Sequence, residues 1–432
     1  MRLLCVFLLA TGTLFGEVRQ LSLQQALAIA ARENPDIALA RLDAQRARHD
    51  IDIARDPFSA KMNIRGDAVE TTGYPNAIGP DSHSPSLLHQ QTDRALYNRP
   101  QRYQVSAAKQ DARGAELSPK AKADDVARQI ASLYLDVEES LKQANALQAE
   151  VAANRKLAEA TSAKVSGGYV LPVELLRSKV ETAQALERLH GIGADREYSE
   201  SLIAVALGFT GNDLVQPTER EENFALPTIE SEDQAADVAL RNNKDLQQLQ
   251  SGMLARRLER KSFGAFRLPQ ADLVEQYSLF AERTYEDYFP SDKFQRNNAE
   301  LGVSFTLPIL IGVEPGARLE QAYIDEEKLQ VQIEDLAHRI RADTEHSFQQ
   351  LTQARNALNV ARQELDLAHD ESATVQSQYG EGRALPTDLE RAMNEENEKQ
   401  LSVYQSETDV ERAKLEVLRQ MGNLMPALTA SR

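Results

Sequence analysis

The histidines of this 432-residue chain are not spaced for catalysis or for metal binding. His338 and His346 are eight residues apart on a predicted helix, whereas the helical zinc motif places its two histidines four residues apart. His83 and His89 fall in a predicted surface loop without the spacing of metal ligands. The sequence also lacks a nucleophile elbow. We therefore predict no catalytic residue, no metal site and no cofactor.

Carboxylates and arginines form a recurring charged pattern. Glu174 stands three residues before Arg177, and Asp388 stands three residues before Arg391. On a helix this spacing brings the two side chains together, and an exposed pair of this kind contributes about 0.2–0.5 kcal/mol. Taken alone, the spacing is explained by ordinary contacts on a helix surface. A further role depends on how the chain as a whole is organised.

The two charged pairs belong to an internal duplication. The string Gly-x-x-Leu-Pro-x-x-Leu-x-Arg starts at Gly168 and again at Gly382, 214 residues later. Residues near the start of the first half match residues 209 positions later. The second half therefore has five additional residues between its opening segment and its copy of this string. The matches at the shift of 209 are Gln25, Ala26, Arg32, Asn34 and Asp36 with Gln234, Ala235, Arg241, Asn243 and Asp245. We conclude that the chain contains two copies of one structural unit.

Each copy is predicted to open with a helix and to continue with two strands. The helices cover about 22–55 and 232–262, with Ser22 and Ser231 as N-caps. Alternation of apolar and polar residues then indicates half-buried strands. The predicted strands are 60–72 and 101–110 in the first copy, and 270–281 and 299–308 in the second.

Each copy ends in a long helical hairpin. Apolar residues step by three and four through about 119–166 and 316–379, which is the pattern of a coiled-coil seam. At 1.5 Å per residue these helices are roughly 70 and 95 Å long, too long for an ordinary globular domain. A glycine-containing turn and a second helix, beginning near Pro172 or Pro386, complete the hairpins at 119–208 and 316–422. Residues 211–231 are predicted to form a linker and 426–432 a tail.

The start of the chain and its composition point to an exported protein. Residues 1–16 have the charged start, short apolar run and small residues of a secretory signal peptide. The formal net charge of −17 argues against nucleic acid as a partner. A single Cys excludes a disulfide framework. No stretch after the signal peptide approaches eighteen consecutive apolar residues, so a membrane role has to use strands.

This order of elements, repeated behind a signal peptide, resembles the TolC-like outer-membrane efflux proteins, or outer membrane factors. The resemblance covers essentially the whole mature chain. The sequence differs from the family after the predicted strand residues 103–107. In the family an apolar segment ends this strand, whereas here the polar residues from Lys109 to Gly114 follow it. The motifs that carry the resemblance are Leu21-Ser-Leu-Gln-Gln-Ala-Leu-Ala with Asn34-Pro35, Leu307-Pro308-Ile309-Leu310 leading to Gly316, Arg318 and Ala322, and the paired strings from Gly168 and Gly382.

The resemblance implies a mainly α fold with a small β part. Each chain contributes a duplicated helix, strand, strand and helical hairpin unit. In a homotrimer these units form one shared antiparallel outer-membrane β-barrel and a long periplasmic α-helical barrel. A barrel shared by three chains is physically reasonable, because the four strands of one chain cannot close a barrel and an unpaired strand edge is not stable inside a membrane.

The resemblance also implies a function as an exit duct in a tripartite efflux or type I secretion system. The expected location is the outer membrane, with a long periplasmic extension. The expected partners are two further copies of the chain, a periplasmic adaptor, an inner-membrane pump and outer-membrane lipid, but not nucleic acid. In the family the hairpin tips close the channel and contact the adaptor. The matching residues are Gly167, Gly168, Leu171, Pro172, Gly380, Gly382, Leu385 and Pro386.

A pore constriction is the site implied next to these tips. Asp388 matches the family's constricting aspartate, and Glu174 is its counterpart in the other repeat. A second constricting aspartate of well-known members is replaced here by Arg391. We therefore hypothesise that Glu174, Arg177, Asp388 and Arg391 form a constriction in which arginine and carboxylate pairs replace bare acidic rings. Ordinary pairs on a helix surface are the alternative.

Two other classes of protein compete with the channel. A periplasmic adaptor also carries a signal peptide and a long hairpin, but it normally has one hairpin between β-rich segments. Another soluble periplasmic coiled-coil protein has no need of strands with alternating faces. The sequence does not identify the transported substrate, whether drug, metal ion or protein.

Overall fold

The computed structural model describes residues 18–66, 86–210, 212–218, 224, 226, 232–280, 297–310 and 312–430. The predicted signal peptide and the predicted cap Ser231 lie outside these residues. The chain divides into two compact units, which we call the hairpin unit and the sheet unit. The hairpin unit is Met1–Arg41, Ser118–Leu246 and Leu336–Arg432; the sheet unit is Leu42–Leu117 and Gln247–Asp335.

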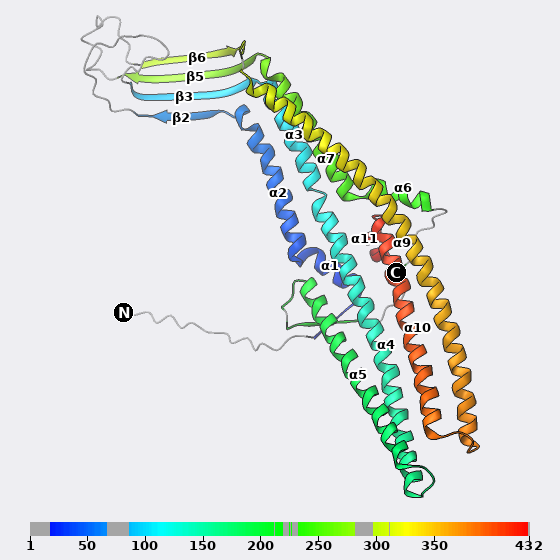
Figure 1. Ribbon diagram of the computed structural model, residues 1–432. Coiled ribbons are helices and arrows are strands. Elements are labelled where there is room, and N and C mark those ends of the chain that lie inside the picture. Colours follow the sequence, from blue (N-terminus) through cyan, green and yellow to red (C-terminus); the bar gives the residue numbers. More distant parts are fainter. Residues whose placement is uncertain are drawn as a thin grey trace, which may run out of the picture. The chain divides into compact units, whose positions relative to one another are not determined.

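Within its described residues, the sheet unit contains four antiparallel strands in the order β2-β3-β5-β6 (Figure 1). Their bounds are Lys61–Arg65 for β2, Ser86–Tyr97 for β3, Gln270–Phe280 for β5 and Asn297–Thr306 for β6. β5 and β6 lie where the alternation of the second copy predicts strands. The central pair, β3 and β5, joins the two copies of the repeat.

The predicted strand at 101–110 is wrong. These residues belong to helix α3, Arg99–Ala115, and the partner of β2 is β3, which lies earlier in the chain. Asn98 caps α3 by accepting a hydrogen bond from the Gln101 amide at 3.0 Å, and Pro100 occupies the first turn. A short alternation between Tyr103 and Ala107 did not outweigh this start signal.

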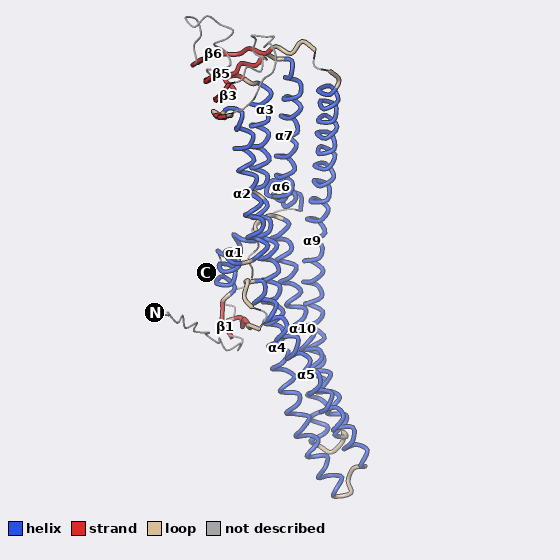
Figure 2. The backbone as a smooth tube through the Cα atoms, turned by 90° about the vertical axis from the view of Figure 1, so that its left-hand side faces the viewer, coloured by secondary structure: helices blue, strands red, loops and turns tan. Residues whose placement is uncertain are grey.

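The hairpin unit contains four long helices, which dominate the backbone drawing in Figure 2. α4 covers Ser118–Ser166 and α5 covers Pro172–Ala206, while α9 covers Glu314–Gly380 and α10 covers Pro386–Gln420. α9 begins in the sheet unit and enters the hairpin unit at Leu336. These bounds agree closely with the predicted coiled-coil segments. The mainly helical architecture with a small sheet part is confirmed.

The opening helix of each copy is broken at an asparagine. In the first copy the break at Asn34 separates α1, Leu23–Glu33, from α2, Pro35–Arg55. In the second, Asn243 separates α6, Glu232–Asn242, from α7, Lys244–Gly264. The predictions of single helices over 22–55 and 232–262 are therefore wrong at these two points. Pro35 disfavours the helical conformation of the residue before it, and both asparagines cap the next helix.

An asparagine at this break also holds each hairpin to its opening helix. Asn34 Nδ2 donates to the carbonyl of Ala206 at the end of α5, at 2.8 Å. In the second copy the donor is Asn242, the residue before the counterpart of Asn34, and its Nδ2 donates to the carbonyl of Met421 at the end of α10, at 3.1 Å. The duplication seen in the sequence is therefore also a duplication of contacts.

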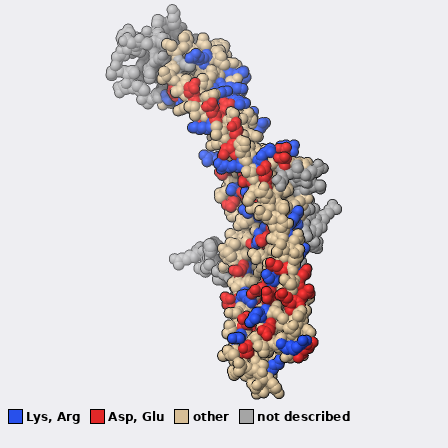
Figure 3. All heavy atoms as spheres, turned by 45° about the vertical axis from the view of Figure 1, so that its right-hand side comes forward, with Lys and Arg blue, Asp and Glu red and all other residues tan. Residues whose placement is uncertain are grey.

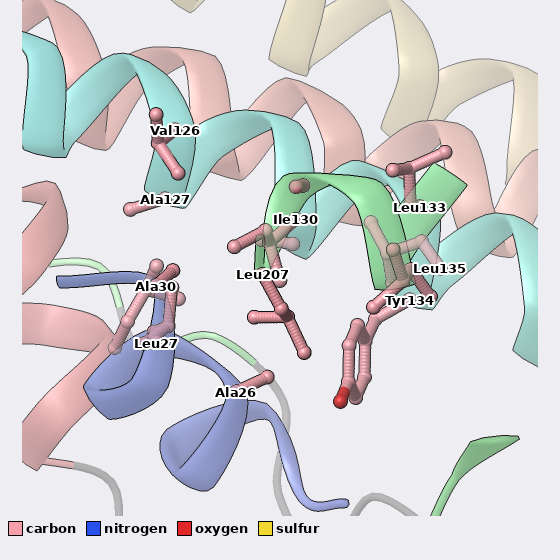
Figure 4. Packing of buried hydrophobic residues seen from close by; sticks show 14 of the residues in the cluster. Ala26, Leu27, Ala30, Val126, Ala127, Ile130, Leu133, Tyr134, Leu135 and Leu207 are labelled. Atoms are coloured by element: carbon pink, nitrogen blue, oxygen red, sulfur yellow. The ribbon is translucent and has the colours of Figure 1, made fainter. Parts of the chain in front are cut away.

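The apolar core of the hairpin unit lies where α1, α4, α5, α10 and the short helix α11, Leu424–Ala430, meet. Small residues of α1, such as Ala26 and Ala30, pack against larger residues of α4, such as Ile130 (Figure 4). Tyr134 fills the edge of the core, and its hydroxyl donates to the carbonyl of Leu21 at 3.1 Å. This core fixes the start of the chain on the first hairpin.

Three short elements were not predicted. β1, Val18–Leu21, pairs in parallel with β4, Leu214–Pro217, which lies inside the predicted linker 211–231. Helix α11, Leu424–Ala430, includes most of the predicted tail 426–432. Leu424 and Leu428 are almost fully buried, so these residues complete the core.

Candidate functional site

The two hairpin tips have the same backbone geometry. α4 and α9 each end in a glycine with a left-handed conformation, Gly168 at φ +75° and Gly382 at φ +74°. The Tyr169 amide donates to the Lys164 carbonyl at 2.9 Å, and the Arg383 amide donates to the Gln378 carbonyl at 2.8 Å. These are the bonds of a glycine-terminated helix end. Gly167 and Gly380 precede these turns, and Pro172 and Pro386 begin the return helices after them.

Both tips expose apolar side chains. Tyr169 is 84% exposed and Leu171 is 69% exposed on the first tip, and Leu385 is 54% exposed on the second. A protein surface seldom gathers large apolar side chains without a partner for them. The tips are therefore chemically suited to a contact with another protein.

The two carboxylate and arginine pairs behave differently. Glu174 and Arg177 form an ion pair at 3.2 Å, with the Glu174 side chain 12% exposed and that of Arg177 63% exposed. Asp388 instead accepts a hydrogen bond from the amide of Leu385 at 3.1 Å and caps its own helix. Asp388 and Arg391 line one groove beside α9, together with Asp370, Glu371 and Glu395. Equivalent positions of the duplication thus have different local roles.

Arg177 and Arg391 share a second groove. It has a volume of about 780 Å³ and lies along the starts of α5 and α10. Its lining alternates between apolar residues such as Val173 and Leu176 and charged residues such as Glu181. The structure therefore brings both predicted arginines to one groove, where each has carboxylates nearby.

A buried polar layer joins the two hairpins, and the sequence analysis did not predict it. Ser178 of α5 donates to Glu390 Oε1 of α10 at 3.0 Å. Asn394 of α10 accepts from Asn154 of α4 at 3.3 Å and donates to Glu181 of α5 at 3.2 Å. The available signal was Asn154, a polar residue within the apolar seam predicted for α4. Because both hairpins contribute to each contact, their relative positions depend on this layer.

Burial perturbs the acids of this layer. It raises the pKa of Glu390, which is 3% exposed; the Ser178 hydrogen bond opposes that shift and the charge of Glu181 adds to it. Burial likewise raises the pKa of Glu150, although Arg188 at 2.6 Å opposes the shift. Both carboxylates are therefore more readily protonated than free ones.

A further cross-hairpin contact lies close to the tips. The Lys164 ammonium of α4 donates to the hydroxyl of Tyr379 on α9 at 2.9 Å, and it lies 4.2 Å from the centre of the tyrosine ring. Tyr379 directly precedes Gly380. This contact links the end of the first outgoing helix to the end of the second.

Acidic side chains gather on one face of the hairpin unit, as Figure 3 shows. α9 and α10 are bridged there by ion pairs such as Lys399 with Glu364 at 2.8 Å and His369 with Glu396 at 2.6 Å. The hydrogen bond that the His369 ring donates to Glu396 raises the pKa of His369. Other exposed acids of α9 and α10 include Asp366, Asp370, Glu371, Glu395 and Glu398.

The sheet has one apolar and one polar face. The register aligns the side chains of Met62, Ile64, Leu88, Leu273, Tyr277, Leu279, Leu301, Val303 and Phe305 on one face, together with the polar Gln90, Thr92, Arg94, Glu275 and Asn297. On the other face it aligns Lys61, Asn63, Arg65, His89, Gln91, Asp93, Asp272, Gln276, Ser278, Asn298, Glu300 and Ser304, together with the apolar Ala95 and Val274. Hydrogen bonds run across the polar face, as between His89 and Ser278 at 3.0 Å. One face is thus suited to an apolar environment and the other to water.

Both edges of this sheet lack a partner strand within the described residues, because β2 and β6 end the strand order. Of the helices in the part of the chain that is described, none has a segment long and apolar enough to cross a membrane. Among those same residues, no cluster of three or more His, Cys, Asp or Glu side chains is arranged to hold a metal ion. His83 lies outside the described residues.

Solved structures with this architecture are outer-membrane proteins. The chain is similar to CusC, a protein studied for transmembrane channel formation, with a TM-score of 0.78, 12% identity and coverage of 93% of this chain and 92% of CusC. It is similar to the CmeC outer membrane channel of Campylobacter jejuni, with a TM-score of 0.76, 14% identity and coverage of 93% and 86%. It is also similar to the outer membrane protein VceC of Vibrio cholerae, with a TM-score of 0.75, 15% identity and coverage of 93% of this chain and 96% of VceC.

At the level of sequence, no protein-family model matches the chain, and no curated protein matches it. The likeness therefore rests on three-dimensional structure, and it extends over almost the full length of both partners. The chain has the fold of the TolC-like outer-membrane channels, and the fold inferred from the sequence is confirmed.

Proposed function

We propose that the protein is a trimeric outer-membrane channel that serves as the exit duct of a tripartite efflux or type I secretion system. The observation that carries this proposal is the sheet with two different faces and two open edges. β3, β5 and β6 have 12, 11 and 10 residues, and about 9–11 residues of tilted strand cross a bilayer. Their apolar face suits lipid, and their polar face suits a water-filled passage.

The open edges are the physical argument for several copies. A strand edge in a membrane leaves backbone amides and carbonyls without partners, at a cost of several kcal/mol each. Pairing β6 of one copy with β2 of the next removes both edges. Three copies give twelve strands, in line with the trimer that the resemblance implies.

In this proposal the helical hairpins continue the passage into the periplasm and carry no catalytic chemistry. The exposed apolar tips contact a periplasmic adaptor, which connects the duct to an inner-membrane pump. Glu174, Arg177, Asp388 and Arg391 form the constriction near the tips. In a trimer they contribute six carboxylates and six guanidinium groups, so the constriction has balanced charge.

Cell fractionation tests the location and assembly. We expect the mature protein in the outer membrane as a trimer that resists detergent and dissociates on heating. Recovery from the soluble periplasm as a monomer would instead favour an adaptor or another coiled-coil protein. Conductance of Asp388→Ala and Glu174→Ala tests the constriction separately. Unchanged current and ion selectivity in both variants would leave these residues as ordinary surface groups.

A further inference from the structure

A connection runs from the end of β6 to the start of α9 (Figure 1), and its described apolar side chains are exposed. It contains seven residues, and no charged residue occurs in the longer stretch from Leu301 to Val313. Exposed fractions are 62, 85, 95 and 89% for Leu307, Ile309, Leu310 and Val313, which we call the apolar connector. Such exposure of consecutive large apolar groups requires a partner.

The fold does not require this connector. In the first copy of the repeat, β3 ends at Tyr97 and α3 begins at Arg99, with Asn98 alone between them. Asn98 both turns the chain and caps the helix. The second copy makes the same passage from strand to helix with seven residues, several of them apolar. Their length and character therefore serve a purpose other than the turn.

The connector prolongs the apolar face of the sheet. Leu301, Val303 and Phe305 lie on that face, and the same alternation continues through Leu307 and Ile309 beyond the end of β6. A second copy paired at the β6 edge would be held by backbone hydrogen bonds in the plane of the sheet. Side chains on a face stand perpendicular to that plane. The partner of the connector is therefore whatever covers the apolar face.

Cations and aromatic rings lie at the same end of the sheet. The register places Tyr97 beside Ala271, one residue from the Gln270 and Thr306 pair at the end of β6. The Arg102 guanidinium lies 5.6 Å from the ring of Tyr97, and the Arg99 guanidinium lies 5.1 Å from the ring of Tyr103. Tyrosines with Arg or Lys are typical of the membrane and water interface, where the cations meet anionic headgroups.

We propose that the apolar connector inserts into the interface of a phospholipid leaflet at this end of the sheet. Its partner is the glycerol and upper acyl region of the lipid. The described residues between β6 and α9, 307–310 and 312–313, belong to no strand or helix that would pair their backbone groups, which excludes the hydrocarbon centre but not the hydrated interface. This inference rests on the proposed function, because it requires the sheet to lie in a membrane.

Tryptophan fluorescence tests the inference cleanly, because the chain contains no Trp. The Leu310→Trp variant reports on the connector, and Ile309→Trp is a second variant in case the first does not assemble. Leu301→Trp reports on the middle of the apolar face of β6, about 17 Å along the strand from its end. Ser304→Trp is the matched control on the polar face. The full-length trimer is reconstituted in phosphatidylcholine vesicles whose lipids are brominated near the glycerol or near the chain methyl.

We expect bromine near the glycerol to quench the connector tryptophan more than bromine near the methyl, and the reverse order at Leu301→Trp. The Ser304→Trp variant should respond to neither lipid. If Leu301→Trp is quenched but the connector is blue-shifted and insensitive to both lipids, a second copy covers it and the inference is wrong. A connector that emits as in water also overturns it. If Leu301→Trp itself escapes quenching, the proposed function fails as well.

Discussion

Glycine substitutions at the hairpin ends give a graded test of the packing described above. Gly208 follows α5 with φ +82°, and a Cβ atom there would lie 2.7 Å from the carbonyl oxygen of Glu33. Gly422 is its counterpart after α10, with φ +67° and a Cβ position 2.8 Å from Asn242 Cβ. Alanine at either site combines an unfavourable backbone conformation with a collision against the end of an opening helix.

The magnitude follows from two contributions. A left-handed non-glycine residue costs about 1–2 kcal/mol, and forcing extra volume into a packed contact costs about 1–3 kcal/mol. Gly208→Ala and Gly422→Ala should each destabilise the fold by about 2–5 kcal/mol. Gly168→Ala is the control for the first contribution, because Gly168 has φ +75° but no atom within 4 Å of the Cβ position. It should cost about 1–2 kcal/mol.

Gly191 completes the series in the opposite direction. It lies inside α5 with open space around its Cβ position, so Gly191→Ala should stabilise the helix by about 0.5–1 kcal/mol. An unfolding entropy of about 2.1 cal/mol/K per residue makes 1 kcal/mol equivalent to about 1 °C for a chain of this length. The thermal midpoint of each variant is measured from the loss of its helical circular dichroism signal on heating, at the same scan rate for all variants.

The expected order of midpoints is Gly191→Ala above wild type, then Gly168→Ala, then Gly208→Ala with Gly422→Ala. Equal midpoints for Gly168→Ala and Gly208→Ala would refute the collision with the opening helix. A large difference between Gly208→Ala and Gly422→Ala would refute the repetition of this contact in the two copies.

Three further predictions concern the hairpin unit. Burial raises the pKa of Glu390, so the folded protein favours the protonated carboxyl. The contribution of protonated Glu390 to stability is present below the ordinary pKa of a glutamate and is lost as the pH rises through the raised pKa. Glu390→Gln, which stays neutral, should therefore melt at a higher temperature than wild type at pH 8 and at the same temperature at pH 4. Tyr379→Phe removes the hydrogen bond that Lys164 donates to the hydroxyl but keeps the aromatic ring. The contact between the two hairpins should become weaker by about 0.5–1.5 kcal/mol, so the channel should open more often in planar bilayers. Asp388→Ala and Glu174→Ala each remove three charges from the trimer and should lower the cation to anion permeability ratio. Both should also lower the thermal midpoint, Asp388→Ala because it removes the cap of α10 and Glu174→Ala because it breaks the ion pair with Arg177.

The long elements were predictable because their patterns are long. Steps of three and four over nearly fifty residues specify α4 almost to the residue, and Pro172 and Pro386 mark where the return helices begin. The alternation of Leu301, Val303 and Phe305 likewise identifies β6. In each case many residues carry the same signal, so no single position decides the assignment.

Short or weak patterns were not predictable in the same way. Five residues around Tyr103 suggested a strand, but Asn98 and Pro100 began a helix. β1 and β4 contain four residues each and form through a contact nearly two hundred residues apart in the chain. Such pairings depend on tertiary structure and have little local signature.

The positions of the two hairpin turns were predictable from the repeat, whereas the contacts between side chains near them were not. The duplication located the hairpin tips and the paired charged residues near them. It did not reveal that Asp388 caps its helix while Glu174 binds Arg177. The layer around Glu390 depends on which helices become neighbours. That information is absent from the spacing of residues along one helix.

Ion conductance across a planar bilayer tests the central claim most directly. Protein extracted from the outer membrane as a trimer is added to one side, with wild type and Tyr379→Phe measured in parallel so that a closed resting state is still detected. The account predicts discrete current steps of one size, with more frequent opening in the variant. Absence of current from both trimers in an intact bilayer would contradict the channel.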